Sequence, residues 1–454
     1  MRGAAMLLAA ALLAGCAGPR PAAPSDAAVA VPPAWRGGQG GEQAIAPDWW
    51  RGFGDPALDA LVARAVAGNV DLLAADTRIA EARAQFRLAA SRSLPSVAID
   101  GNAGRSRALN PLGMGIDQTH ATGELTIAYE ADLFGRLASA TDASRKTLAA
   151  TGFARDTLRI ALVATIVSGY ATLRGLDAQR AIVAATVEAR AGELAVIRRR
   201  YRSGYGSLLE LRQAETAYES AARLVPVTEL AITRQENGLS LLAGDAPGPI
   251  ARGKDVGALV PGSIPQALPA DLLRQRPDIA EAEARLGAAD RSLDAARAAF
   301  MPSVQLSASG GAVASTLLSD PVSLFSLGGS ILAPLFRGGA LRAEADAAAA
   351  RRDAAAYAYR KTVLTAFGEV EDAMAAVQRL GEEAAVLDRQ VEANRASLTL
   401  AQRRYRAGYA SYLDQLDAER SLLDIELQRT ALQAERLAAI VALYRSLGGG
   451  WGRA

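Results

Sequence analysis

The chain has 454 residues, 50% of them hydrophobic but only 5% aromatic, and its 50 Lys and Arg nearly balance its 48 Asp and Glu. That balance leaves no bulk field that would attract nucleic acid, so we expect no nucleic-acid partner. The low aromatic content, with abundant Ala, Leu, Arg and Glu, favours long helices over sheet sandwiches.

The N-terminus predicts a lipoprotein signal peptide. Residues 1–15 carry one Arg and then an apolar run that is too short to span a bilayer and fits a secretory hydrophobic region. The run ends in LAGC, small residues before Cys16, as in a bacterial lipobox; an ordinary signal peptide with an incidental cysteine is the alternative. We expect a covalent lipid on Cys16, which as the only cysteine excludes disulfides. Ala17 after it, rather than Asp, indicates the outer-membrane-directed class.

The stretch 16–48 is rich in Pro, Gly and Ala, and we expect a lipidated, extended tether there. Asp55 is placed to cap a helix that has Pro56 at its first position. That helix is expected over 56–91, and Pro95 ends it. Because no run of about 18 apolar residues follows, we expect no transmembrane helix, and any membrane crossing must use β-strands.

Two strands are expected next, each of roughly 10 residues, the length that a tilted membrane strand needs. Leu125 and Ile127 alternate with Thr126 and Ala128, which predicts one apolar and one polar face. The lone histidine, His120, is expected in the loop between these strands, and one His cannot make a metal site. We therefore predict no metal and no cofactor apart from the lipid on Cys16.

Long helices follow. Residues 137–201 contain no Pro and predict one helix on the order of 100 Å long. The turn 203–206 reverses the chain, and a second helix is expected over 207–242, with Pro226 as a candidate kink.

The pattern then restarts, which indicates an internal duplication. Motifs of the first half recur in the second, at an offset of 207 residues and then of 204. The pairs are Asp71 and Asp278, Arg78 and Arg285, Pro95 and Pro302, Tyr201 and Tyr405, and Gly204 and Gly408. We predict two structural repeats, 49–243 and 269–447, joined by a linker, 244–268, and followed by a tail, 448–454.

Each repeat supplies two strands, so the chain has four. Four strands cannot close a barrel inside lipid, where an open edge is prohibitive, and small transmembrane barrels begin at eight strands. The strands must therefore close by oligomerisation, and either two or three copies satisfy closed symmetry. Leu416, Leu423 and Leu427 have coiled-coil spacing, which predicts a cylinder of packed helices coaxial with the barrel.

The chain resembles the TolC-like outer membrane factors, in particular their lipoprotein efflux branch, the NodT family. The motifs that carry the resemblance span nearly the whole mature chain: the lipobox, WW..F.DPALDALV, RIAEARA, LPSV, YEADLFGR, the paired YR.GY.S.L turns, RPDI..AE..L, FMPS, PLFRGG and LYRSLGGGW.

The resemblance implies an α+β membrane protein with an internal duplication. It implies a homotrimer in which a twelve-stranded outer-membrane β-barrel, four strands per chain, continues into a long periplasmic α-helical coiled-coil barrel. Such proteins are passive exit ducts of tripartite efflux pumps and are not enzymes. Their partners are a periplasmic adaptor protein, an inner-membrane pump of the resistance-nodulation-division type, and outer membrane lipid.

The resemblance also places the two hairpin turns at the periplasmic entrance, where the adaptor would bind. The residues implied are Arg202, Gly204, Ser207, Gly408 and Ser411. The alternative is that these glycines and serines only cap helices.

Asp414 and Asp417 lie one helical turn apart and match the family's aspartates that constrict the closed periplasmic gate. In a trimer they would form a ring of carboxylates that attracts cations and favours partial protonation. The alternative is two solvated acids near a helix N-terminus, which the helix dipole favours.

Glu210 occupies the equivalent turn of the first repeat, and Tyr405 matches a tyrosine that helps to hold the family's gate shut. The basic residue that usually completes this link falls at Ala410 here, so another residue would have to supply the positive charge. The candidates to replace it are Arg202, Arg404 and Arg406.

Two other functions are weaker. An enzyme could use Asp414 and Asp417 as a carboxylate pair, but no Ser–His pair, glycine-rich phosphate loop or metal cluster accompanies them. A periplasmic coiled-coil scaffold lipoprotein without a pore would explain the helices and Cys16, but not the duplicated amphipathic strands.

Overall fold

The computed structural model describes residues 20–36, 45–109, 111–261 and 269–452, so Cys16 lies outside the described residues. The chain divides into two compact units. The unit that carries the strands, here the sheet unit, holds the described residues up to Ala28, Thr77–Gly152 and Glu281–Lys361. The other, here the hairpin unit, holds Val29–Asp76, Phe153–Ala280 and Thr362–Ala454.

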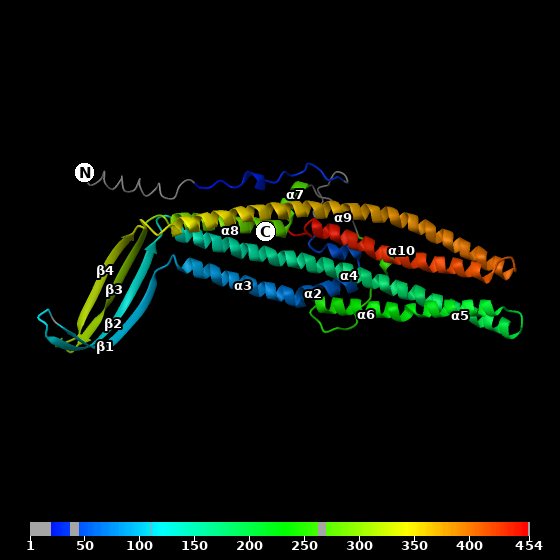
Figure 1. Cartoon of the computed structure of the whole chain (residues 1–454), viewed down its shortest axis with the longest axis horizontal. Helices are drawn as coiled ribbons and strands as arrows, with labels where there is room; N and C mark the ends of the chain where they lie inside the picture. Colours follow the sequence, from blue (N-terminus) through cyan, green and yellow to red (C-terminus); the bar gives the residue numbers. More distant parts are fainter. Residues whose placement is uncertain (1–19, 37–44, 110, 262–268, 453–454) are drawn as a thin grey trace. The chain divides into compact units, whose positions relative to one another are not determined.

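The sheet unit contains one antiparallel sheet of four strands in the order β1-β2-β3-β4 (Figure 1). The strands are β1 (Ser96–Leu109), β2 (Gly115–Ala131), β3 (Ser303–Ser315) and β4 (Val322–Leu332). At 11 to 17 residues they are longer than expected. His120 lies within β2, opposite Gly104, so its predicted place in a loop was wrong: the ladder continues well beyond the alternating segment.

The register gives this sheet one apolar face. Val97 lies opposite Ile127, which lies opposite Ala308, which in turn lies opposite Leu327. The neighbouring row on the same face runs from Ile99 through Leu125 and Gly310 to Phe325. Exposure within the single chain reaches 82% at Ile99 and 85% at Phe325. The alternation predicted from Leu125 and Ile127 is therefore confirmed.

The opposite face is mainly polar. Its rows include Ala98, Thr126, Ser309 and Ser326, and Thr126 donates a hydrogen bond of 3.2 Å to the carboxylate of Asp100. A sheet with one apolar and one polar face needs an apolar medium on one side and water on the other.

Helices make up most of the rest of the chain. Those of the first half are α2 (Pro56–Gly68), α3 (Val70–Ser91), α4 (Arg136–Arg202), α5 (Leu208–Ala222) and α6 (Leu224–Leu242). Those of the second half are α7 (Pro269–Gln275), α8 (Pro277–Ala298), α9 (Ala340–Arg406) and α10 (Tyr412–Ser446). Both α4 and α9 have 67 residues, and α9 begins and ends 204 residues after α4.

Two helices predicted as continuous are broken. The helix expected over 56–91 stops at Gly68, because the Asn69 carboxamide accepts hydrogen bonds of 3.1 Å from the N–H groups of Asp71 and Leu72 and starts a new helix. The helix expected over 207–242 breaks at Arg223. Pro226 explains this break, because its ring excludes the carbonyl four residues before it from the helical ladder.

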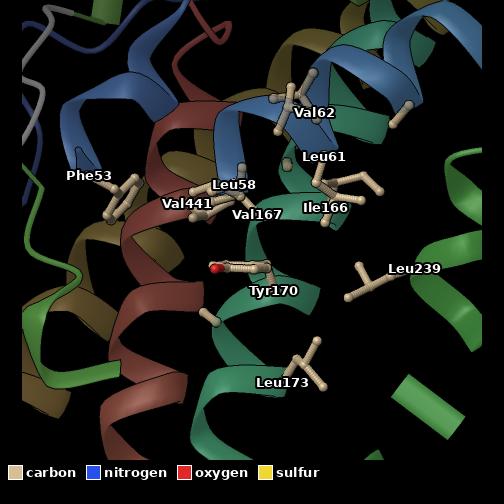
Figure 2. Close-up of a cluster of buried hydrophobic side chains, with 14 of the residues drawn as sticks. Phe53, Leu58, Leu61, Val62, Ile166, Val167, Tyr170, Leu173, Leu239 and Val441 are labelled. Carbon is tan, nitrogen blue, oxygen red and sulfur yellow. The ribbon is translucent and has the colours of Figure 1, made fainter. Parts of the chain in front are cut away.

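The core of the hairpin unit lies where α2, α4, α6 and α10 meet (Figure 2). Leu58, Leu61, Ile166 and Tyr170 are almost completely buried there. Asp55 caps α2 as predicted, accepting a hydrogen bond of 2.9 Å from the N–H of Ala57 and another of 2.9 Å from the Tyr170 hydroxyl. Within the described ranges, α4 alone is long and apolar enough to cross a membrane, but 56% of its most apolar window is buried inside the chain, as in a core helix.

The C-terminal GGGW motif packs against other elements of the hairpin unit. Gly448 has φ +96°, and a Cβ there would lie 2.0 Å from the carbonyl oxygen of Gln275, so only glycine fits. Trp451 packs edge-on against Phe153 at 5.7 Å, and its indole N–H donates to Asp156 at 3.0 Å.

The described part of the predicted tether makes specific contacts. In the sheet unit, Arg20 pairs with Asp290 at 3.1 Å, and the Tyr357 hydroxyl donates to Asp26 at 2.9 Å. In the hairpin unit, the buried Trp35 packs edge-on against Phe367 at 6.1 Å. Residues 20–36 are thus held in place by side-chain contacts, whereas a free tether would make none.

Candidate functional site

The two predicted hairpin turns have the same geometry. In the first, the Gly204 N–H donates to the Tyr201 carbonyl at 3.0 Å and the next N–H, of Tyr205, donates to Arg200 at 2.9 Å. In the second, the equivalent bonds from Gly408 and Tyr409 measure 3.0 and 2.8 Å. Both glycines have φ +79°, so each long helix ends in a Schellman motif with glycine in the left-handed conformation.

A serine starts the returning helix at each turn. The Ser207 hydroxyl accepts from the N–H of Leu209 at 3.1 Å, whereas Ser411 forms a complete capping box with Asp414. In that box the Asp414 carboxylate accepts from the Ser411 N–H and hydroxyl, both at 2.9 Å. The capping role that the sequence offered as an alternative for Ser207 and Ser411 is therefore present.

The predicted gate acids lie on the surface of α10. Asp414 is exposed, and the hydrogen bonds from Ser411 hold the pKa of its carboxyl below the ordinary value. Asp417 is also exposed and lies 3.6 Å from the Arg420 guanidinium. Within one chain Asp414 is therefore ionised at neutral pH, and the partial protonation expected for a carboxylate ring would have to come from neighbouring copies.

Tyr405 lies on the inner side of the turns. It packs against a cluster of Leu194, Ile197, Leu211, Ala214, Ala217, Tyr412 and Leu416, which come from α4, α5 and α10. Its hydroxyl is buried and makes no hydrogen bond within the described residues. Burial, followed by the charge of Glu210, raises the pKa of the Tyr405 hydroxyl. The charge of Glu210, on the first hairpin, thus acts on Tyr405, on the second.

A buried polar cluster, here the α4–α10 cluster, joins the hairpins next to Tyr405. The Gln415 amide donates to Glu193, in a short contact, and to Glu419 at 2.8 Å. The Arg190 guanidinium donates to Glu419, also in a short contact, and lies 3.8 Å from Glu193. The Tyr412 hydroxyl donates to Glu193 at 3.5 Å. The side chain of Arg190 is only 6% exposed and that of Glu419 only 12%.

A cavity of about 810 Å³ lies beside this cluster, between α4, α9 and α10. Its wall combines the cluster with apolar side chains, among them Ile197, Leu398 and Leu422. Arg406 also lines it, but the ion pair that joins the hairpins here comes from Arg190. Within the described parts of the chain, none of the candidates Arg202, Arg404 and Arg406 forms an ion pair, although Arg404 contributes to lowering the pKa of Asp414.

The chain matches the family described as outer membrane efflux protein over residues 61–245 and 268–449. It is similar to two Pseudomonas putida proteins. The solvent efflux pump outer membrane protein SrpC is 35% identical over 445 residues, which cover 95% of this chain and 94% of that protein. The pyoverdine export outer membrane protein OpmQ is 34% identical over 447 residues, 94% of each chain. The solved outer-membrane channel OprN superposes with a TM-score of 0.87 at 30% identity, over 96% of this chain and 100% of that one.

The chain belongs to the outer membrane efflux protein family. The TolC-like resemblance of its motifs is thereby confirmed. This outer membrane efflux protein is a channel for export, and its family is one of transport channels rather than of enzymes.

The α4–α10 cluster is the part of the site that the sequence did not predict. Tyr412, Gln415, Leu416 and Glu419 follow the spacing of one buried helix face, and all but Glu419, which is half-buried, are buried. Two polar residues on that face were a usable signal, because a polar side chain in a helical seam needs a partner. Gln415 and Glu419 lie beside the predicted gate acids in the sequence but on the inward face of α10, whereas Asp414 and Asp417 are exposed.

Proposed function

We propose that this outer membrane efflux protein works as a homotrimer whose twelve strands close one barrel in the outer membrane. The observation that carries the proposal is the four-stranded sheet with one apolar face and with β1 and β4 as unpaired edges. Such edges cannot face lipid, because their backbone N–H and C=O groups would lose water without gaining partners. Pairing β1 of one copy with β4 of the next removes every edge.

Three copies are favoured over two because the assembly has to do more than close a barrel with its strands: its helices must also enclose a lumen. The recurrence of α4 as α9, 204 residues later, supports an origin by duplication, which would give a trimer six near-equivalent hairpins around that lumen. Native mass spectrometry of the detergent-extracted protein tests the stoichiometry. A trimer is expected, and its electrophoretic migration should change on heating. A monomer that a salt wash releases from membranes would favour the scaffold lipoprotein instead.

The channel is proposed to receive its substrates from an inner-membrane pump of the resistance-nodulation-division type through a periplasmic adaptor. The adaptor is proposed to contact the turns at Arg202, Gly204, Ser207, Gly408 and Ser411, all of them exposed in the single chain. The relatives named for solvent efflux and pyoverdine export support small organic molecules as the exported class. Co-purification of the adaptor with the channel tests this assignment, and loss of co-purification on mutating the turns is expected.

We propose that Cys16 carries the lipid that anchors the mature N-terminus to the outer membrane. The lipobox supports this, and several acyl chains on one residue give stable anchoring where one chain is marginal. Mass spectrometry of the mature N-terminus should find an acylated Cys16, and Cys16→Ser should abolish the added mass. An unmodified N-terminus at another residue would contradict the lipoprotein assignment.

The periplasmic gate is proposed at Asp414 and Asp417, helped by Tyr405 and Glu210. Because Asp414 also caps α10, its replacement by Ala would remove a cap together with a charge. The better variant is Asp414→Asn with Asp417→Asn, since an Asn oxygen still accepts from the Ser411 N–H. Single-channel recording should show higher conductance and weaker block by multivalent cations.

The matched control is Asp424→Asn, an exposed acid seven residues further along α10. It should leave conductance and block as in the wild type. Unchanged conductance and block in the Asp414→Asn, Asp417→Asn double variant would show that the gate lies elsewhere.

A further inference from the structure

The α4–α10 cluster holds two carboxylates for one cation. Glu193 on α4 and Glu419 on α10 share the same amide donor, Gln415, and face the same guanidinium, Arg190. With both carboxylates ionised, the cluster carries one uncompensated negative charge in a largely buried place. Burying an unpaired charge is costly, so the arrangement favours a state in which one proton is retained.

Glu193 is the group that would hold this proton. Burial first, and then the charge of Glu419, raise the pKa of the Glu193 carboxyl to about 7. Glu419, by contrast, accepts a hydrogen bond from the Arg190 guanidinium in a short contact, so the cation of the cluster lies nearer to Glu419 than to Glu193. The Tyr412 hydroxyl, whose pKa is raised by burial, stays protonated and donates to Glu193.

The position of the cluster connects this proton to the first turns of α10, which carry the proposed gate acids. Gln415 lies between the proposed gate acids Asp414 and Asp417 on the first turns of α10, and it is 4% exposed. A contact that fixes Gln415 to α4 therefore fixes the stretch of helix that carries both acids. We propose that Glu193 and Glu419 retain one proton between them and, with Arg190 and Gln415, act as positioning residues that hold the start of α10 against α4, so that loss of the proton loosens the entrance.

The inference rests on the proposed gate at the start of α10, but the hold of α10 on α4 can be measured without it. Other charged or titratable side chains come close to the cluster from each neighbouring element. They are Glu188 and Arg200 on α4, Glu210 on α5, Tyr405 and Arg406 on α9, and Glu426 on α10. Glu188, Arg200 and Arg406 are exposed, whereas Glu193 is half-buried and its carboxyl is the one whose pKa is raised to about 7.

The direction of the pH effect follows from linkage. We call the separation of α10 from α4 opening. Opening releases the Glu193 carboxyl to water, where its pKa returns to the ordinary value of 4.5, whereas its pKa is about 7 when α10 is held against α4. The held state thus binds more protons between these values, and its stability falls as pH rises through that window. With these two values, opening should become about tenfold more favourable between about pH 6 and about pH 8.

Hydrogen exchange of the full-length protein in detergent tests this. The amides of residues 412–420 should lose about tenfold in protection between about pH 6 and about pH 8, after correction for intrinsic exchange rates. Glu193→Gln keeps the size and hydrogen bonds of a protonated Glu but cannot ionise. This variant should keep the protection of about pH 6 at both values.

The matched control is Glu188→Gln, which removes an exposed carboxylate from the same helix and the same cavity wall. It should retain the wild-type pH dependence. A purely structural role for Glu193 would change protection equally at both pH values and leave the tenfold ratio intact. That result, or a wild-type protein without pH dependence in 412–420, overturns the proposal.

Conductance separates this inference from the gate assignment. If Glu193→Gln abolishes the pH dependence of exchange while Asp414→Asn with Asp417→Asn leaves conductance unchanged, the proton-dependent hold stands and the gate lies elsewhere. If the double variant opens the channel but exchange in 412–420 is independent of pH, the gate stands and the hold is refuted.

Discussion

The two hairpin turns have the same backbone but lead into different helices. Gly204 and Gly408 share φ +79° and the same pattern of Schellman hydrogen bonds, and a serine caps the returning helix in each. After the first turn, α5 ends within 15 residues; after the second, α10 continues unbroken for 35. The glycine and its hydrogen bonds are thus set by local backbone requirements, while the returning helices differ in the side chains that face other helices.

The turns also differ in how closely the residue two positions after the glycine approaches the backbone of the preceding helix. A Cβ on Gly206 would lie 2.9 Å from the backbone N of Tyr201, whereas Ala410, 204 residues later, already carries a Cβ. The turns therefore share the Schellman hydrogen bonds and the glycine φ, but the backbone approaches more closely at residue 206 than at residue 410. The second turn has the capping box, and the start of its returning helix, α10, makes the polar contacts with α4.

The largest effect that separates the turns should come from Arg190. Arg190→Met leaves Glu419 buried without its cation, and breaking one side of a buried pair typically costs about 3–5 kcal/mol. The loss should be concentrated on α10, so exchange protection should fall in 412–420 more than in 208–216. Thermal unfolding of the purified protein, followed by circular dichroism, measures the total loss.

A second substitution serves as the control. Adding Glu419→Leu to Arg190→Met removes the stranded charge, and an apolar replacement of a buried pair is often neutral. Most of the lost stability should therefore return. A double variant as unstable as the single one would show that the ion pair is not what holds α10 to α4.

The two turn glycines should respond equally. Gly204→Ala and Gly408→Ala place a side chain at φ +79°, where no atom lies within 4 Å of the new Cβ, so the cost comes from the backbone alone. About 1–2 kcal/mol is expected for each, by thermal unfolding. Gly381→Ala, in the interior of α9 and also without neighbours, is the control and should stabilise the helix. Unequal costs at Gly204 and Gly408 would mean that the turns differ in backbone as well as in side chains.

Local patterns were enough to predict much of this molecule. The strand faces follow from the alternation at Leu125 and Ile127, and the turns from the recurrence of Tyr, Gly and Ser at a constant offset. The break at Asn69 was missed although part of its cause is local, because the carboxamide accepts from the N–H groups of Asp71 and Leu72; the bond that it donates to the carbonyl of Leu242, 173 residues away, is the part that no local pattern contains. A short stretch of sequence around Asn69 does not include Leu242.

The α4–α10 cluster was missed for a related reason. Gln415 and Glu419 stand among exposed acids on a helix, where polar residues are usually solvated. Their burial depends on Glu193 and Arg190, and the bond from Gln415 to Glu193 joins residues 222 positions apart. The proposed trimer could not be predicted from local patterns either, since neighbouring copies would decide what the exposed faces of the sheet and of α10 contact.

The smallest expected difference concerns the two caps. Ser207→Ala removes one hydrogen bond, to the N–H of Leu209, whereas Ser411→Ala also removes the hydroxyl that donates to Asp414. Loss of a serine cap costs about 1 kcal/mol, so both variants should fold, and Ser411→Ala should be the less stable of the two.

Ser→Asp at each position restores an acceptor for the helix N–H groups and is the matched control. At 411 the new carboxylate would face Asp414, so Ser207→Asp should recover stability better than Ser411→Asp. Equal losses in Ser207→Ala and Ser411→Ala would show that the capping box adds nothing to the second turn, and the asymmetry between the turns would then come from the buried face of α10 alone.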